Sequence, residues 1–447
     1  MKRDIIIAYE NIVREYDNAL LLKAELVARG YNVKIVYKYD MLFRMRPGAI
    51  VVVPNCYTPE NYDSYRYYLN MNANIFISLQ YEQVLSERIE KTEVHIPKGK
   101  AKNAFLFCWG QNCYRRLASK GINNEKIRIC GAMQLDFLRK EFDDFYFDKS
   151  EIAKKYGLDL NKKWLLYISS FSYVDNPIIA KYTAKELNDD DFVNEFSALS
   201  VRSQKETLKW FEKLIEENKD IIVIYRKHPV EANSKEVSKL LTKYPDQFRD
   251  ISELSVKQWI MVSDICATWF STSAAEIYMA KRPLLILRPY PIKREYDVPF
   301  YFNAEYIDTY EKMIIKCKSG GEAPFPISKE LLEDYYLLSE EPAYKNIADQ
   351  ITDILNDEVL YKNDTEKGFI FKRWLYFIKN RIVIKYFLKK LYQFLFLNMG
   401  FRIKNSNIRK KYAVVEWEKL AKNSADETNI YKYEKLKEII KRYNETK

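Results

Sequence analysis

The sequence predicts an α/β fold made of two parallel-sheet domains, followed by a basic, aromatic helical extension. Short apolar runs of strand length alternate with helical patterns through most of the chain. This alternation is typical of a parallel sheet that helices cover on both faces. A charged stretch interrupts it once, after Asp136, and a length of 447 residues suits two or three domains. We therefore expect domains at 1–140 and 164–335, a linker at 141–163 and a helical extension at 336–447.

The first domain shows the alternation clearly. We expect a helix at Asn18–Arg29, which Gly30 ends as a C-cap, and another at Gln111–Lys120 before Gly121. The apolar runs that predict its strands are Ile5–Ala8, Val33–Tyr37, Ile50–Val53, Ile75–Leu79, Phe105–Trp109 and Ile127–Cys130.

The second domain repeats the pattern after the linker. Its polar stretch Ser172–Asn194 is too long for an ordinary connection, so we expect an active-site loop there. Helices are predicted at Ser203–Lys219, Ser234–Tyr244, Ser255–Val262 and Ser273–Ala280. Strands are predicted at Trp164–Ser169, Ile221–Tyr225, Ile265–Thr268 and Leu284–Leu287. The order suggests two sheets that face each other across a cleft.

Composition excludes several classes of protein. A hydrophobic fraction of 47% allows a packed core. The six cysteines form no CxxC pair and most lie in apolar runs, so buried, reduced thiols in a cytoplasmic protein are expected. Only His95 and His228 are available as imidazoles, which argues against a zinc site. The first residues lack the long apolar region of a signal peptide.

Two motifs stand where predicted strands end. His228-Pro229 follows Ile221–Tyr225, and the proline stops the strand and favours an extended histidine. Ser271-Thr272-Ser273 follows the strand Ile265–Thr268 and opens a helix. Ligands of open α/β sheets bind beyond the carboxyl ends of strands. An imidazole and several hydroxyls there can hold a phosphate. The alternatives are a surface histidine beside a turn proline and, for Ser273 with Glu276, a capping box.

These motifs resemble those of bacterial surface-carbohydrate glycosyltransferases. Arg226–Glu231 resembles their R-x-H-P-x-E stretch, and Ser255–Pro289 is similar to their second motif. More weakly, 107–110 and 129–136 resemble their WG and GxxxxD elements. The same motif pair occurs in bacterial sialyltransferases, β-Kdo transferases and CDP-glycerol polymerases. The resemblance implies a GT-B fold, which has two Rossmann-like domains and holds the donor nucleotide in the second.

The resemblance also implies roles for individual residues. His228 and the hydroxyls of the Ser271–Ser273 stretch, including Thr272, would hold the donor phosphate, and Glu276 the ribose. Arg226 and Glu231 belong to the same donor-binding stretch. GT-B enzymes generally use no metal, so the acidic run Asn188–Asp191 is expected to be merely solvated, and no cofactor beyond the donor is expected.

The catalytic acid is harder to assign. The family's D/E-D/E-G position holds Gln80-Tyr81-Glu82-Gln83, so Glu82, after a predicted strand, is the candidate base. The alternative for Glu82 is a solvated acid at a helix start. If the reaction retains configuration, Asp191 or Glu195 could instead be a covalent nucleophile.

The stretch 367–415 carries thirteen Lys and Arg and no Asp or Glu, so the rest of a chain of net charge +11 is close to neutral. Its many aromatic residues make it typical of a segment that lies on an anionic membrane. The alternative is a helix pair docked on the body of the protein. Charge alone also allows nucleic acid, but no recognisable module for it accompanies the segment. The final stretch, Glu416–Lys447, predicts a charged helix.

The sequence thus predicts a GT-B glycosyltransferase of capsule or O-antigen type polysaccharide synthesis. The expected donor is a CMP-activated sugar acid such as Kdo or a sialic-acid relative. The expected acceptor is a glycan or lipid-linked glycan at the inner face of the bacterial cytoplasmic membrane. Two alternatives stay open: transfer of polyol phosphate from CDP-glycerol or CDP-ribitol, and a catalytically inactive scaffold of an assembly complex.

Overall fold

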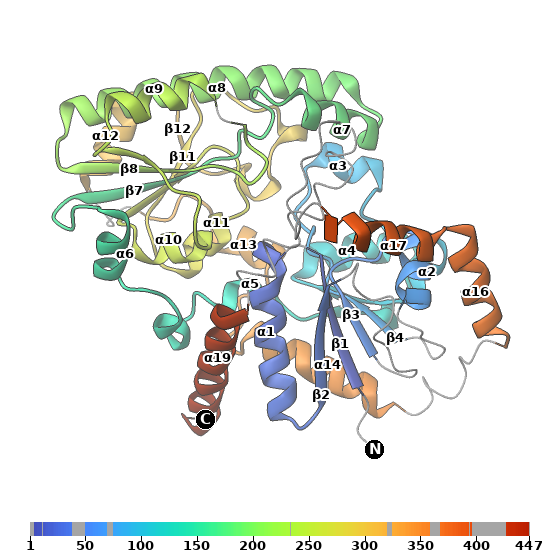
Figure 1. Cartoon of the computed structure of the whole chain (residues 1–447). Helices are drawn as coiled ribbons and strands as arrows, with labels where there is room; N and C mark the ends of the chain where they lie inside the picture. Colours follow the sequence, from blue (N-terminus) through green and yellow to red (C-terminus); the bar gives the residue numbers. More distant parts are fainter. Residues whose placement is uncertain are drawn as a thin grey trace.

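The computed structural model shows two sheet domains with helices around each (Figure 1). It describes residues 4–10, 12–37, 50–68, 75–232, 234–319, 324–357, 367–392, 394–395 and 426–446. The parts of the basic segment and of the predicted last helix at 396–425 lie outside the described residues.

The first sheet has six parallel strands in the order β2-β1-β3-β4-β5-β6. The four inner strands are strongly apolar, as expected when helices cover both faces, whereas the edge strands β2 and β6 carry Lys34 and Arg128. Their bounds are β1 Asp4–Tyr9, β2 Asn32–Tyr37, β3 Ile50–Val53, β4 Ile75–Ser78, β5 Phe105–Cys108 and β6 Ile127–Ile129. The six strands predicted for this domain are therefore all present.

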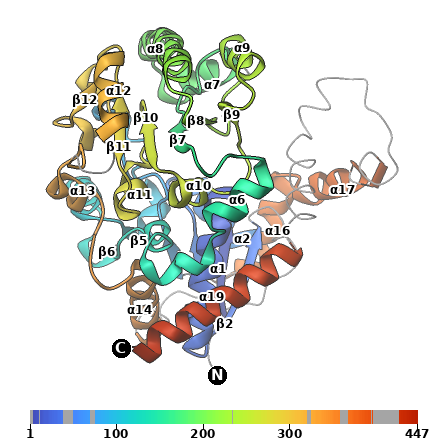
Figure 2. The ribbon, with the colours of Figure 1, turned by 90° about the vertical axis from the view of Figure 1, so that its left-hand side faces the viewer.

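Helices from both ends of the chain cover this sheet. On one face lie α1 (Ile12–Ala28), α14 (Ala343–Asn356) and α19 (Asp426–Thr446), whose buried side chains form one core with the strands. The other face is covered by α2 (Pro59–Tyr68) and α4 (Gln111–Ser119). The helical extension thus returns to the first domain, and Figure 2 shows α19 and α14 beside α1.

The second sheet also has six parallel strands, in the order β12-β11-β10-β7-β8-β9. The chain order changes direction between β7 and β10, as in a Rossmann fold, and ligands of such sheets bind at that switch point. The bounds are β7 Lys163–Ile168, β8 Ile221–Arg226, β9 Phe248–Asp250, β10 Ile265–Thr268, β11 Leu284–Leu287 and β12 Tyr306–Ile307.

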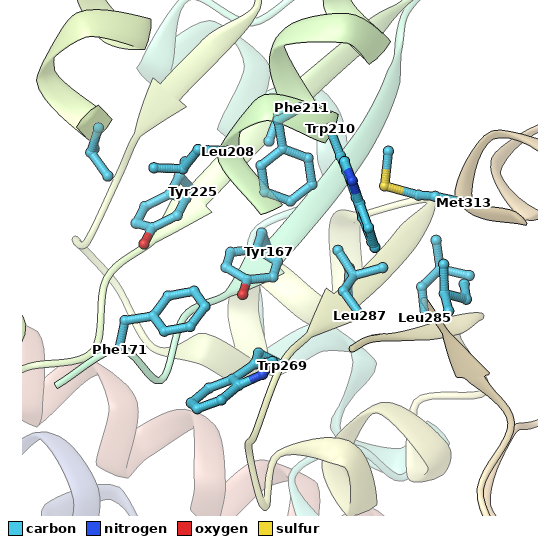
Figure 3. Close-up of a cluster of buried hydrophobic side chains, with 14 of the residues drawn as sticks. Tyr167, Phe171, Leu208, Trp210, Phe211, Tyr225, Trp269, Leu285, Leu287 and Met313 are labelled. Carbon is cyan, nitrogen blue, oxygen red and sulfur yellow. The ribbon is translucent and has the colours of Figure 1, made fainter. Parts of the chain in front are cut away.

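The core of the second domain lies on both faces of its sheet. Tyr167, Trp210 and Phe211 pack between the strands and helix α8 (Asp190–Glu217), and Figure 3 shows this aromatic layer. The rings of Tyr167 and Phe211 meet edge to face, with centroids 5.0 Å apart. Also on this face are α9 (Lys235–Lys243) and α12 (Tyr310–Ser319). The opposite face is covered by α6 (Lys149–Tyr156), α10 (Val256–Val262), α11 (Ala274–Met279) and α13 (Lys329–Tyr335).

The prediction of a loop at Ser172–Asn194 is wrong. The segment holds helix α7 (Pro177–Leu187) and the start of α8, which begins 13 residues before the predicted Ser203. Asp189 caps α8, since its Oδ1 accepts the N–H of Phe192 at 3.1 Å. The linker is also more ordered than expected, because a 3₁₀ helix at Lys140–Phe145 and α6 lie within it.

The domains meet through polar and aromatic contacts. Arg88, in the short helix α3 (Glu87–Thr92) after β4, pairs with Asp189 at 2.6 Å. Trp109, just after β5, stacks on Tyr336 with ring centroids 5.6 Å apart. Residues that follow β4 and β5 therefore face the second domain, which is the arrangement expected of two domains that enclose a substrate.

Candidate functional site

Strands β8, β7 and β10 bring the two predicted motifs to one edge of the second sheet. Ile168 at the end of β7 pairs with Arg226 on one side and with Thr268 on the other. Neighbouring strands lie about 4.8 Å apart, so these two strand ends are separated by roughly 10 Å. His228 follows one end by two residues and Ser271 follows the other by three. Both loops therefore begin at the same level, on either side of β7.

Glu231 fixes the shape of the histidine loop. Its Oε1 accepts the hydroxyl of Tyr225 at 2.7 Å, and its Oε2 accepts the hydroxyl of Ser169 at 2.6 Å. Oε2 also accepts the backbone N–H of His228 at 3.1 Å, and Gln204 donates to Oε1 at 3.2 Å. Burial raises the pKa of Glu231. These bonds use the carboxylate within the protein, so Glu231 holds the loop that carries His228.

One ring nitrogen of His228 accepts a hydrogen bond from its own loop. Its Nδ1 accepts the N–H of Val230 at 3.4 Å, which puts the proton of the neutral ring on Nε2. The residue is exposed at the sheet edge. Although part of its surface is exposed, the protein packed around the ring partly desolvates it, and this lowers the pKa of His228 below its usual value. A phosphate beside Nε2 would raise that pKa again, because it favours the charged form.

The guanidinium of Arg226 forms hydrogen bonds within the protein. Its guanidinium donates to the carbonyl oxygens of Glu253 at 2.9 Å and Leu254 at 2.6 Å. Burial lowers the pKa of Arg226 to about 10. The side chain thus holds the connection from β9 to α10, and this geometry gives it a supporting role rather than a contact with a phosphate.

The hydroxyl loop after β10 is braced from two sides. Ser271 Oγ accepts the N–H of Ser273 at 3.2 Å, and the Ser271 carbonyl accepts the hydroxyl of Tyr301 at 2.5 Å. Thr272 is exposed at the tip. The capping box considered for Ser273 and Glu276 is not formed in the described structure. Ser273 already has helical angles, φ −61° and ψ −6°, whereas a capping residue is normally extended.

Glu276 lies in a half-enclosed place between the domains. Lys257 is its nearest cation, with Nζ 3.8 Å from Oε1, and both side chains are largely buried. The charge of Glu276 contributes to raising the pKa of Tyr146 from the linker and of Tyr336 near α13, although burial is the main cause in both. A carboxylate here can accept bonds from a ligand's hydroxyls while Lys257 limits the cost of its burial.

The three candidate acids have different surroundings. Glu82 follows β4 in the first domain, is half exposed and pairs with Arg14, which also bonds Glu15. Asp191 is exposed in the first turn of α8. Glu195, one turn later, pairs with Lys293 at 2.6 Å and accepts the Tyr296 hydroxyl at 2.9 Å.

The first turns of helix α8 lie against the hydroxyl loop. Phe196, next to Glu195, packs edge to face on Phe270 with ring centroids 5.4 Å apart. Within the acidic run Asn188–Asp191, Asp189 caps α8 and pairs with Arg88, as described above. Among the described residues, no group of three or more His, Cys, Asp or Glu is arranged to hold a metal.

Sequence reasoning missed the residues that join the two motifs. Ser169 bonds Glu231 of the histidine loop, and Ser170 Oγ accepts the N–H of Phe270 in the hydroxyl loop at 3.1 Å. Both follow β7, at the switch point of the sheet. The signal was present, since two adjacent hydroxyl residues, Ser169 and Ser170, stand at the end of a predicted apolar strand.

Comparison with known proteins gives similarity of fold at low identity. No family model and no curated protein matches the chain. The MnaA–UDP complex of S. aureus is 16% identical, covers 85% of this chain and 97% of its own, and has a TM-score of 0.43. The UDP-GlcNAc 2-epimerase of Methanocaldococcus jannaschii with UDP-GlcNAc and UDP is 13% identical, with 79% and 100% covered and a TM-score of 0.49. The wall teichoic acid polymerase TagF is 13% identical, with 80% and 90% covered and a TM-score of 0.49.

Proposed function

We propose that the protein is a GT-B glycosyltransferase of surface-polysaccharide synthesis that transfers a sugar from a cytidine-activated donor. The observation that carries the proposal is the edge of the second sheet at β8, β7 and β10. There the loop that carries His228 and the hydroxyl-rich loop after β10 begin roughly 10 Å apart, at the switch point, and the proton of the neutral imidazole is on Nε2. The donor class, a CMP-linked Kdo or sialic-acid-like sugar, follows from the motif resemblance.

In the proposed reaction, the bond between the anomeric carbon and the phosphate oxygen breaks, and its electron pair leaves with CMP. His228 and the hydroxyls of the β10 loop donate to the phosphate oxygens as negative charge develops on them. Glu276 receives the ribose hydroxyls. An acceptor hydroxyl, on a glycan or lipid-linked glycan at the inner face of the membrane, attacks the anomeric carbon.

The proton of that hydroxyl needs a base, and we propose Glu82. It stands after β4 in the domain opposite the donor, where the resemblance puts the family's acid. The ion pair with Arg14 must open or shift for Glu82 to reach a substrate. If the reaction proceeds through a covalent intermediate, Glu195 or Asp191 is the nucleophile. Turnover of Glu82→Gln, Glu195→Gln and Asp191→Asn separates these roles, because only the acting acid is needed for chemistry.

The test is a panel of nucleotides scored by thermal unfolding. CMP and CMP-sugars should stabilise the protein, by about 2.7 kcal/mol at 100 times Kd. His228→Ala should lower turnover by roughly a hundredfold or more, as loss of one charge-stabilising donor does, with little change in fold. If CDP-glycerol alone stabilises the protein, the transferred group is a polyol phosphate rather than a sugar. If no cytidine nucleotide stabilises the protein, the scaffold is the better account.

A further inference from the structure

Helices α16 (Phe369–Lys379) and α17 (Ile382–Tyr392) expose two apolar stripes with the same spacing. In each helix the exposed positions follow the pattern i, i+1, i+4, i+5, i+8, which is one continuous face. Their exposed fractions run from 42% to 80%. The residues are Ile370, Phe371, Trp374, Leu375 and Ile378 in α16, and Val383, Ile384, Phe387, Leu388 and Leu391 in α17.

The opposite face of α16 is anchored to the first domain. Phe369 stacks on Tyr67 of α2 with ring centroids 5.7 Å apart, and Tyr376 approaches the same ring at 4.8 Å. Arg373 Nε donates to the carbonyl of Tyr67 at 2.7 Å. The helix therefore has one face for the protein, and its apolar stripe points outward. In Figure 2, α17 projects to one side of both domains.

The charges carried by these two helices are all of one sign. Residues 367–392 contain eight Lys and Arg and no Asp or Glu. At 3.6 residues per turn, Lys372, Lys379 and Lys385 fall beside the stripes rather than within them. Long lysine stems can reach past an apolar face to charged groups at its border.

This combination selects one kind of partner. A second copy of the chain would bring the same basic face against itself, because a twofold interface pairs identical patches, and the cations would repel each other. An anionic bilayer supplies both an apolar layer and negative headgroups. No helix in the described part of the chain is long and apolar enough to cross a membrane. Helices of 11 residues instead suit the plane of the interface.

We propose that α16 and α17 dock the protein on an anionic membrane surface, with both stripes entering the boundary between headgroups and acyl chains. The docking requires neither a particular donor nor catalytic activity, so it stands or falls separately from the proposed reaction.

The test uses the full chain and lipid vesicles. Wild-type protein should sediment with vesicles of phosphatidylcholine and phosphatidylglycerol and much less with phosphatidylcholine alone. The double variant Trp374→Ser/Phe387→Ser should bind at least tenfold more weakly. Lys379→Glu/Lys385→Glu should lose the preference for anionic lipid, since each lysine contributes about 1 kcal/mol, or roughly fivefold. Ile315→Ser is the matched control, because Ile315 is an equally exposed residue of α12 in the second domain.

The fluorescence of Trp374 measures how deeply α16 enters the bilayer. The contribution of Trp374 is the difference in fluorescence between wild type and the Trp374→Phe variant. Lipids brominated near the headgroup should quench this contribution. All substituted side chains are exposed, so thermal unfolding of the variants should match wild type and shows that weak binding is not misfolding. Equal binding by wild type and the double serine variant would overturn the proposal. The proposal would also be overturned if brominated lipids left the fluorescence of Trp374 unquenched. A third contradicting result would be a wild-type protein that binds no vesicles but forms a dimer, which the double serine variant converts to a monomer.

Discussion

At the scale of single residues, the sheet edge that we propose binds the donor depends on Glu231 as much as on His228. One carboxylate gathers donors from the β7 end, from β8, from α8 and from the backbone of the histidine loop. Hydrogen bonds to a charged group are stronger than neutral ones, which explains why an acid occupies this place despite the cost of burying it. The position of the imidazole is therefore set by residues that need not touch the substrate.

Replacing Glu231 with Gln tests this positioning role. The amide turns an NH₂ group toward donors on one side, so the free energy of unfolding should fall by about 1–2 kcal/mol, with relief of charge burial offsetting part of the loss. Nucleotide affinity should fall as well, and the NMR signals of His228 should shift even without nucleotide. Glu236→Gln, a change of a half-exposed residue on α9 that pairs with Lys239, is the control. A Glu231→Gln protein with an unshifted His228 would contradict the role.

The hydroxyl loop shows how a residue pattern alone can mislead. Ser273 and Glu276 have the spacing of a capping box, but the chain enters α11 with Ser273 already helical, so its side chain cannot fold back over the helix end. The spacing of the capping box is present, but the helical backbone angles of Ser273 could not be read from the sequence.

At the scale of elements, the start of α14 explains the GxxxxD pattern. The carboxylate of Asp136 accepts the N–H groups of Ala343 at 3.0 Å and Tyr344 at 2.7 Å, and it pairs with Arg139. The preceding Gly131 has φ +86°, and a Cβ there would come within 2.9 Å of Ala343. These two residues thus seat the helix that returns from the second domain to the first.

Asp136→Asn should therefore destabilise the protein. One backbone N–H would face an NH₂ group in a buried place, and the pair with Arg139 would be lost, at a cost of roughly 3 kcal/mol. Urea unfolding followed by circular dichroism measures the change. Asp353→Asn, an exposed substitution on the same helix, should have almost no effect. Equal stability of the two variants would show that Asp136 does not secure α14.

Helix α8 shows why the predicted loop was wrong. Its first turns are polar overall, which suggested a loop, but Phe192, Phe196 and Leu199 have helical spacing and are buried. The helix could have been predicted from the spacing of the apolar residues, rather than from the overall polarity of the segment.

At the scale of the whole molecule, the sequence was sufficient for the fold class and for all ten predicted strands, because buried parallel strands are short apolar runs. It did not predict that α14 and α19 join the core of the first domain, since a local pattern shows which face of a helix is apolar but not which partner covers it. The two motif loops could be placed on one edge from strand direction alone. The catalytic acid could not, since its role depends on how the two domains and both substrates meet.

The central claim is that His228 holds the donor phosphate, and NMR of the two histidines tests it most directly. His95 is partly buried, and desolvation of its ring lowers its pKa to about 4, so near neutral pH the titrating signal belongs to His228. Without nucleotide the pKa of His228 should lie below 6.5. Saturation with CMP should raise that pKa, so nucleotide binding takes up a proton and tightens as the pH falls toward the lower of the two values. An unchanged or lower pKa of His228 in protein saturated with CMP would contradict the account.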